Sequence, residues 1–433
     1  MDALRLAASC LLFGAALGAA AEPADAGRRL YLEGVTPSGG PLRALVGVGN
    51  APIAGHAVAC GNCHGVDGRG RPEGTLFPSD LTWEDLTKPY GHSRALRKHR
   101  AYTAASFARA VNEGVDPDGN RLDWAMPRFA LSRSELDALV AHLQRLGAER
   151  DPGVGEASLR IGTILPNGSA AAQAVRAALE GFVESLNRAG GIHQRRLELV
   201  AAHDDAPVFA LLSLREEFEA RGLPAVAAFG RQEGGTAFSV FSSPAAQAAL
   251  LVEFANRRGS LRPAILAADD RAHLGAAAAE QCAKRGCADP VRIDWRANEL
   301  DAVGVVRRLK QARREQIFFF GAQAELAQLL DAVARMPDAG WQPTVYLSVP
   351  PSPRAAALSA AAVLAEGLRR AGRDLSRERF VRALESLNNY DPQGYGPPVS
   401  FGPDRRIGAR GGYVAALERE HGLVPASGWI SLD

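Results

Sequence analysis

Short apolar runs alternate with amphipathic helical segments from residue 159 onward. The runs LRIGTIL (159–165), PAILAAD (263–269) and QIFFFGA (316–322) each precede a stretch with helical periodicity. Alternation of this kind predicts βαβ units and a parallel sheet. Because the run at 317–320 is apolar at every position, we expect a sheet that is covered on both faces.

The N-terminal part has a different pattern, in which helical segments are joined by long polar loops rich in Gly and Pro. Its last helix begins at SRSE, where Ser132 and Glu135 predict a capping box, and Gly147 is expected to end it. The stretch AERDPGVGEAS (148–158) is charged and then rich in Gly and Pro. We therefore expect domains at 27–148 and 159–433, joined by a linker at 149–158. The apolar stripe of the helix is Leu136, Leu139, Val140, Leu143 and Leu146.

The first residues have the pattern of a secretory signal peptide at 1–21. Arg5 precedes an apolar run at 6–17, and small residues follow at 19–21. The run is shorter than the about 20 residues of a spanning helix, and Cys10 precedes too much of it for a lipid-anchored form. We expect a periplasmic protein without a membrane span, exported to an oxidising compartment.

Composition and charge narrow the function classes. Of 433 residues 47% are hydrophobic and 23% charged, which is a globular composition, and the formal net charge is +2. There is no basic field of the kind that binds nucleic acid. Away from the signal sequence and the motif below, Cys282 and Cys287 form a close pair around a helix end at Gly286, for which we expect a local disulfide. The alternative is two small buried thiols.

The stretch ACGNCHG (59–65) carries the chemistry of the first domain. A structural zinc site needs four ligands, and neither the next cysteine, Cys282, nor His92 and His99 have a suitable spacing. A redox dithiol is expected within a βαβ unit, and the flanks here are loop-like. The order Cys-x-x-Cys-His is the attachment signature of c-type haem. It predicts thioether bonds from Cys60 and Cys63 and an axial iron ligand at His64.

A low-spin haem needs a second axial ligand, and the thioether of Met is the usual one. Of the three Met residues, Met1 lies in the signal sequence and Met336 in the α/β block, which leaves Met126 in DWAMPRFALS. Met126 could also be a core residue. His56, His92 and His99 remain as alternative ligands.

Together, CGNCHG, the loop VDGRG, Met126 in MPRF and the closing helix resemble a class I monohaem cytochrome c over residues 27–148. The resemblance implies an all-α bundle around one haem c, with His64 and Met126 on opposite faces. It also implies a tight turn at Gly65, Gly68 and Gly70 and a carbonyl near Pro78 that accepts from His64. Trp124 and Phe129 are expected either to wall the haem or to pack in the core. A Gly/Pro-rich insert at 35–53 departs from the family and is expected to cover a haem edge or dock a partner.

The second block resembles the type I periplasmic solute-binding proteins of the leucine/isoleucine/valine kind. The segments that carry the resemblance are IGTILPNGS, LNRAGGIHQRRLELVAAHDD, FSVFSSPAAQAALLVEFA and GPPVSFGPDRRIGARGGYVAAL. The family implies an α/β fold with two Rossmann-like lobes and a ligand cleft between them. The loop 166–169 is expected to be a helix cap rather than a ligand contact. For Asp204 and Asp205 we expect a turn or cap role rather than acid–base chemistry.

Two departures from that family indicate a shortened domain. Only GRQEGGTA separates the strand at PAVAAF from FSVFSS, where members insert a helix and a strand, and VYLSVPPSPR leads almost directly into a helix. Both losses flank the expected cleft, so we assign no solute ligands.

The combined pattern predicts an electron carrier rather than an enzyme, since a haem with both axial positions filled has none left for oxygen or peroxide. The expected partner is a periplasmic dehydrogenase or oxidase, with the second domain used for docking or sensing. The alternative is an ABC-transporter-type receptor for an amino acid or small organic ligand that carries an accessory haem. A two-haem peroxidase would need a second Cys-x-x-Cys-His, which the sequence lacks.

Overall fold

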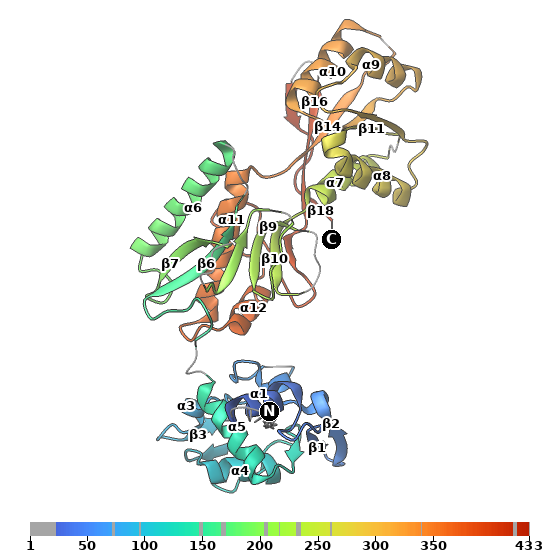
Figure 1. Ribbon diagram of the computed structural model, residues 1–433. Coiled ribbons are helices and arrows are strands. Elements are labelled where there is room, and N and C mark those ends of the chain that lie inside the picture. The colour runs from blue at the N-terminus through green and yellow to red at the C-terminus, as the bar shows by residue number, and fades with distance from the viewer. Residues whose placement is uncertain are drawn as a thin grey trace, which may run out of the picture. The chain divides into compact units, whose positions relative to one another are not determined.

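The computed structural model divides the chain into two compact units, Met1–Glu149 (unit 1) and Arg150–Asp433 (unit 2), and each is described by itself (Figure 1). The expected signal sequence at 1–21 lies outside the described residues, as do the loop 166–169 and the pair Asp204 and Asp205. The structure describes residues 23–71, 74–94, 97–146, 150–165, 170–202, 207–215, 217–230, 235–259, 262–338, 340–418 and 422–432.

Unit 1 contains a helical core. The first helix packs on the last one at a crossing where a Cβ on Gly27 would lie 2.0 Å from the carbonyl oxygen of Ala138, so only glycine allows the approach. The capping box of Ser132 and Glu135 is present at the start of the last helix. The helices are α1 (Pro23–Glu33), η1 (Gly55–Val58), α2 (Cys60–His64), α3 (Trp83–Leu86), α4 (Ala104–Glu113) and α5 (Arg133–Arg145).

Unit 1 also contains strands, so the expected all-α organisation is incomplete. The insert at 35–53 provides β1 (Arg43–Val46) and most of β2 (Ala51–Ala54), which form an antiparallel hairpin. The other edge of β1 pairs with β5 (Arg128–Phe129), and Ala44 lies opposite Phe129. The insert therefore supports the segment that follows Met126. A second hairpin consists of β3 (His92–Arg94) and β4 (Arg97–His99).

The first sheet of unit 2 is parallel throughout and has the strand order β15-β10-β9-β8-β6-β7. Helix α11 packs on β8, β9 and β10, and α6 and α12 pack on α11 (Figure 1). The strands are β6 (Ser158–Ile164), β7 (Arg196–Ala201), β8 (Ala210–Ser213), β9 (Ala225–Gly230), β10 (Ala237–Ser242) and β15 (Ile407–Ala409), and the helices are α6 (Ala170–Arg188), α11 (Pro353–Ala371) and α12 (Arg377–Glu385).

The second sheet has the order β12-β11-β13-β14-β16-β17, with β18 also paired to β16. Ile317 and Phe319 of β13 pack with α9 and α10, whereas Phe318 and Phe320 pack with α7 and α8, so the expected burial on both faces is confirmed. The strands are β11 (Ala264–Ala268), β12 (Val291–Trp295), β13 (Gln316–Phe320), β14 (Thr344–Val349), β16 (Gly411–Glu418), β17 (Gly422–Pro425) and β18 (Ile430–Ser431), and the helices are α7 (Pro244–Arg257), η2 (Asp269–Arg271), α8 (Ala272–Arg285), α9 (Ala302–Gln311) and α10 (Gln323–Arg335).

The chain passes between the two sheets three times, after β10, after β14 and after β15. This is the two-lobed arrangement that the sequence predicts. The shortened connection between β9 and β10 is also present: these parallel neighbours are joined by residues 231–236, whereas a parallel pair usually needs a crossover of a dozen residues or more.

Residues 150–158, expected as a linker, pack against unit 2 instead. The carboxylate of Asp151 accepts from the backbone N–H of Arg377 at 2.6 Å, and Val154 is buried in the first core of the unit. A Gly/Pro-rich composition cannot distinguish a free connector from a turn that hydrogen bonds fix in place.

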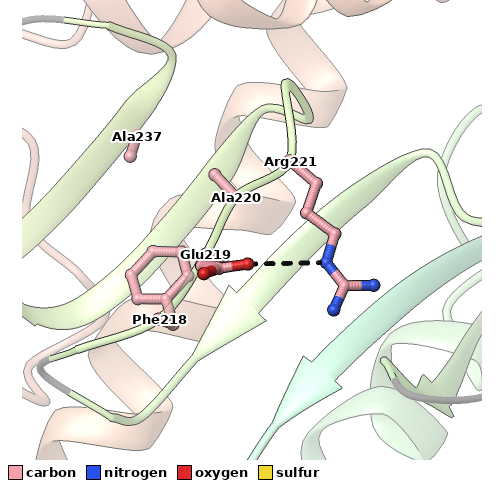
Figure 2. A pocket seen from close by; sticks show the side chains of 5 residues that line it. All are labelled: Phe218, Glu219, Ala220, Arg221 and Ala237. Atoms are coloured by element: carbon pink, nitrogen blue, oxygen red, sulfur yellow. Dashed lines mark ion pairs between the residues drawn. The ribbon is translucent and has the colours of Figure 1, made fainter.

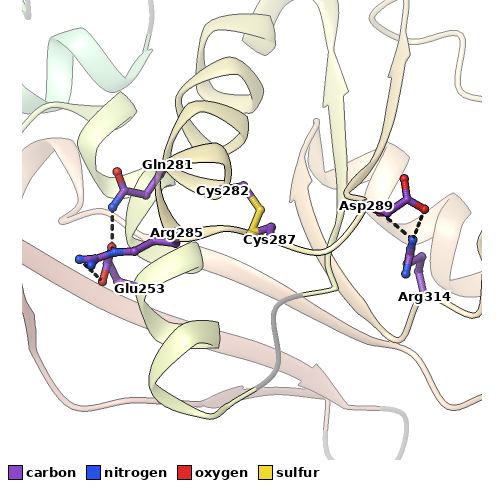
Figure 3. Close-up of a disulfide and its surroundings, with 7 residues drawn as sticks. All are labelled: Glu253, Gln281, Cys282, Arg285, Cys287, Asp289 and Arg314. Carbon is purple, nitrogen blue, oxygen red and sulfur yellow. Dashed lines mark hydrogen bonds and ion pairs between the residues drawn. A yellow bond between two sulfur atoms is a disulfide. The ribbon is translucent and has the colours of Figure 1, made fainter.

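A disulfide joins Cys282 to Cys287 at the end of α8, the pair that the sequence singles out (Figure 3). Gly286 adopts a left-handed conformation at the helix C-cap, and the N–H of Cys287 donates to the carbonyl of Cys282 at 3.0 Å. Two residues further on, Asp289 accepts from the buried guanidinium of Arg314 (Figure 3). Among the described residues, no helix is both long and apolar enough to cross a membrane.

Candidate functional site

A cavity of about 1040 Å³ lies in unit 1 and is lined by all four residues that the sequence proposes as haem contacts. Cys60, Cys63 and His64 come from the single-turn helix α2, and Met126 comes from the loop that precedes β5. The two groups are far apart in the sequence, and the fold brings them to the same cavity. Much of the remaining wall is apolar and includes Leu30, Leu42, Phe107, Leu139 and Leu143.

Hydrogen bonds to carbonyl groups hold α2 and the glycine that follows it in place. The buried hydroxyl of Tyr31 donates to the carbonyl of Gly65 at 2.8 Å, and the N–H of Arg71 donates to the carbonyl of Cys63 at 2.8 Å. Burial raises the pKa of the Cys60 thiol to about 12, so this thiol stays protonated at neutral pH, whereas Cys63 is exposed. Sequence reasoning missed the contact of Tyr31, since no spacing rule links it to the motif.

A hydrogen bond to Ser79 orients His64. Its side chain is buried, and Nδ1 lies 2.9 Å from the carbonyl oxygen of Ser79. Because a carbonyl only accepts, Nδ1 carries the proton, and Nε2 is the nitrogen whose lone pair would bind a metal. The acceptor is thus the neighbour of Pro78, where the sequence suggested a carbonyl. At Gly70, a Cβ would lie 2.2 Å from the carbonyl oxygen of Pro78, which explains the glycine in this turn.

The loop that carries Met126 is fixed mainly by Arg128, a residue that sequence reasoning missed. Its guanidinium donates to the carbonyls of Met126, Leu122 and Asp123, the last two at 3.0 and 3.1 Å. Burial lowers the pKa of Arg128, with a further contribution from the charge of Arg121. The pairing of β5 with β1 holds the other side of this segment.

The remaining candidates fall into two groups. Phe129, His92 and His99 line the cavity. Trp124 is 63% exposed and His56 is also exposed, and neither is among the described residues that line the cavity. Of the expected wall residues, the structure therefore places only Phe129 at the cavity.

These features fit a covalently held iron porphyrin. One large cavity with mainly apolar walls is lined by two thiols, a thioether and an imidazole whose Nδ1 is hydrogen-bonded to a carbonyl. A structural zinc ion fits less well, because the described residues contain no group of three or more His, Cys, Asp or Glu side chains that could hold a metal ion.

Comparison with known proteins agrees with this geometry. Residues 54–147 match the family model described as cytochrome c. This part of the chain is a cytochrome c domain. The matched range contains the attachment motif, the acceptor carbonyl of Ser79, Met126 and the closing helix α5. The family implies a covalently bound haem c. None of the curated proteins matches the chain.

The solved structures that are similar to the chain match the fold of unit 2. A fatty acid ABC transporter substrate-binding protein from Thermomonospora curvata has a TM-score of 0.50 and 13% identity, over 65% of this chain and 95% of that chain. A putative branched-chain amino acid ABC transporter protein from Rhodospirillum rubrum has a TM-score of 0.49 and 16% identity, over 62% and 99%. A branched-chain amino acid ABC transporter protein from Thermus thermophilus with bound valine has a TM-score of 0.47 and 14% identity, over 64% and 97%.

A smaller hollow, of about 420 Å³, lies beside the first sheet of unit 2 (Figure 2). It is lined by Phe218, Glu219, Ala220, Arg221 and Ala237, and the ion pair between Glu219 and Arg221 spans 3.9 Å with both side chains largely exposed. An exposed pair of this kind contributes little energy, and none of these five lining residues is a buried polar side chain.

Proposed function

We propose that the protein is an exported c-type cytochrome with one haem, which transfers single electrons to or from a periplasmic dehydrogenase or oxidase. The observation that carries the proposal is that Cys60, Cys63, His64 and Met126 line one cavity within the segment that matches cytochrome c. In this proposal the protein is an electron carrier and not an enzyme.

The bound haem would supply a one-electron iron couple, and the chain would set how it works. Cys60 and Cys63 hold the porphyrin through thioether bonds, and His64 offers Nε2 to the iron while Ser79 fixes the ring. The sulfur of Met126 would be the second ligand of the iron, and a thioether ligand favours the reduced iron and raises the potential. With His64 and Met126 both as ligands, the iron would have no position left for oxygen or peroxide.

The axial ligand provides the test. We expect the Met-to-iron charge-transfer band of the oxidised protein to disappear in Met126→Ala and to persist in Met336→Ala, a matched control in unit 2. Pigment content measured on the same samples separates loss of the ligand from loss of the haem. A band that survives in Met126→Ala would contradict the assignment of Met126. A pigmented wild-type protein without the band would instead point to a nitrogen ligand, with His92 and His99 as the candidates that line the cavity.

Unit 2 supports a second candidate function, that of an ABC-transporter-type receptor with an accessory haem. The similarity to the T. curvata protein extends over 95% of that chain, so the two-lobed fold is nearly complete despite its short connection between β9 and β10. If unit 2 is a receptor, an amino acid, a fatty acid or another small organic ligand raises its unfolding temperature. If a screen of these compounds leaves the temperature unchanged, the receptor function is contradicted, and a docking role for unit 2 is favoured.

A further inference from the structure

Part of the lining of the unit 1 cavity is polar, in contrast to its mainly apolar walls. Arg97, His92 and His99 of the β3–β4 hairpin line the cavity together with Tyr102, and the ring of His99 contacts those of His92 and Tyr102. Two buried nitrogen atoms there, Nη1 of Arg97 and Nε2 of His92, have no hydrogen-bond partner among the described residues. Buried polar atoms are nearly always paired in a complete site, so a bound group would supply what these atoms need.

The charge of Arg97 is matched only in part by the protein. Its Nη1 lies 3.5 Å from a carboxylate oxygen of Asp116, but the two atoms form no hydrogen bond. Asp116 is fully buried, and its oxygens already accept from the N–H groups of Asp118 and Asn120 and from the side-chain amide of Asn120. Nη1 of Arg97 therefore remains a donor without a hydrogen-bond acceptor among the described residues.

A guanidinium can only donate, so its missing partner must be an acceptor. Tyr102 also lines the cavity and adds a hydroxyl donor. Burial raises the pKa of its phenol to about 12, with a further rise from the charge of Asp116. A porphyrin carries two propionate carboxylates as its anionic acceptors. A planar guanidinium matches a carboxylate well, and burial strengthens such a bond.

We propose that Arg97 and Tyr102 bind the propionate carboxylates of the porphyrin, with the ring of His92 beside them, and so make the β3–β4 hairpin the anionic end of the haem site. This inference rests on the proposed function. With the porphyrin bound, Cys60 and Cys63 would hold one edge of it at α2, and Arg97 and Tyr102 would hold its carboxylates at the hairpin.

The test uses the full haem-loaded chain and two readouts, the reduction midpoint potential and the carboxylate bands in the redox-difference infrared spectrum. Removing the cation in Arg97→Leu leaves the carboxylates uncompensated and favours the oxidised iron. We expect about a tenfold shift of the redox equilibrium, or about 59 mV to lower potential for one electron, and displaced carboxylate bands. Arg97→Lys should recover most of the potential, and Tyr102→Phe should shift the bands with a smaller change of potential.

The matched control is Arg100→Leu, three residues further along, because Arg100 pairs with Asp118 at an exposed position and does not line the cavity. The inference is overturned if a loaded Arg97→Leu protein has the potential and the carboxylate bands of the control. If Arg97→Leu does not accumulate because Asp116 is left buried without its cation, the bands of Tyr102→Phe and Arg97→Lys decide in the same way. A colourless wild-type chain would instead contradict the proposed function itself, and the hairpin assignment with it.

Discussion

The cores of the two units are completed in different ways. In unit 1, Leu30, Leu139 and Leu143 belong to the buried core and at the same time line a cavity of about 1040 Å³. In unit 2, the side chains of β13 fill both faces of the second sheet against four helices of the same unit. If the proposed haem fills this cavity, unit 1 needs a group that is not polypeptide to complete its core, whereas the second sheet of unit 2 is packed by its own side chains.

The cysteines show the same contrast. Cys282 and Cys287 cross-link each other at the end of a helix, where they stabilise the protein without any cofactor. Cys60 and Cys63 are thiols at the wall of the cavity, and burial keeps the Cys60 thiol protonated. The first pair is a cross-link of its own unit, and the second is the pair to which the proposed haem would be attached.

The largest expected effect is the loss of unit 1 when the haem cannot be attached. In Cys60→Ser/Cys63→Ser, an unfilled cavity leaves apolar walls in contact with water. We expect unit 1 to lose its cooperative unfolding transition, a loss on the order of 5 kcal/mol or more, while the transition of unit 2 stays unchanged. Calorimetry and native-state hydrogen exchange followed by peptide would resolve the two units.

The control for this variant is Cys282→Ser/Cys287→Ser, which should keep its colour and the transition of unit 1. If the motif variant kept the protection of α1 and α5 against exchange at the level of the pigmented protein, the polypeptide alone would fill its core. The comparison between the units would then be wrong.

Removal of the disulfide is expected to lower the free energy of unfolding by an intermediate amount, and only in unit 2. In Cys282→Ser/Cys287→Ser, the short loop at the end of α8 regains freedom in the unfolded chain. We expect the free energy of unfolding of unit 2 to fall by about 2 kcal/mol. We also expect faster hydrogen exchange at Arg314, whose partner Asp289 lies two residues beyond Cys287. Urea unfolding monitored at unit 2 measures this loss. A fall in the stability of unit 1 as well would show that the units are not independent.

Local signals in the sequence were sufficient for much of the fold and of the site. The order Cys60, Cys63, His64 lies within one helical turn, and the capping box of Ser132 and Glu135 spans four residues, so short-range rules capture both. The apolar run at 317–320 likewise predicts a strand covered on both faces, because each of its side chains needs a neighbour in the core.

Contacts between distant segments were not predictable from a single sequence. The insert that looks like a loop in the sequence contains a strand, in which Ala44 pairs with Phe129 close to Met126. The sequence does not show this pairing, because backbone pairing depends on register and leaves no side-chain signature. Arg128 and Arg97 were missed for a similar reason. Among many arginines of the chain, only the fold shows which guanidinium faces carbonyls and which faces the cavity.

The smallest expected effect concerns an ion pair of unit 2 and its dependence on pH (Figure 3). Burial alone would raise the pKa of Glu253, but hydrogen bonds from Arg285 at 2.6 and 3.0 Å and from Gln281 outweigh it, and the pKa falls below the ordinary 4.5. A carboxyl with a lowered folded pKa stabilises the protein above its unfolded pKa and loses that contribution as pH falls through the folded value. Glu253→Gln should therefore cost about 1 kcal/mol or less at neutral pH, and the cost should shrink as the pH falls through the folded pKa.

Urea midpoints of unit 2, measured at steps from about pH 6 to about pH 3, would show how the stability of the wild type and of the variant changes with pH. The control is Glu280→Gln, since Glu280 pairs with Lys284 at an exposed position on the same helix as Arg285. If Glu253→Gln and Glu280→Gln show the same dependence on pH, the buried pair contributes no more than a surface pair. The self-sufficiency of unit 2 would then rest on its apolar cores and its disulfide alone.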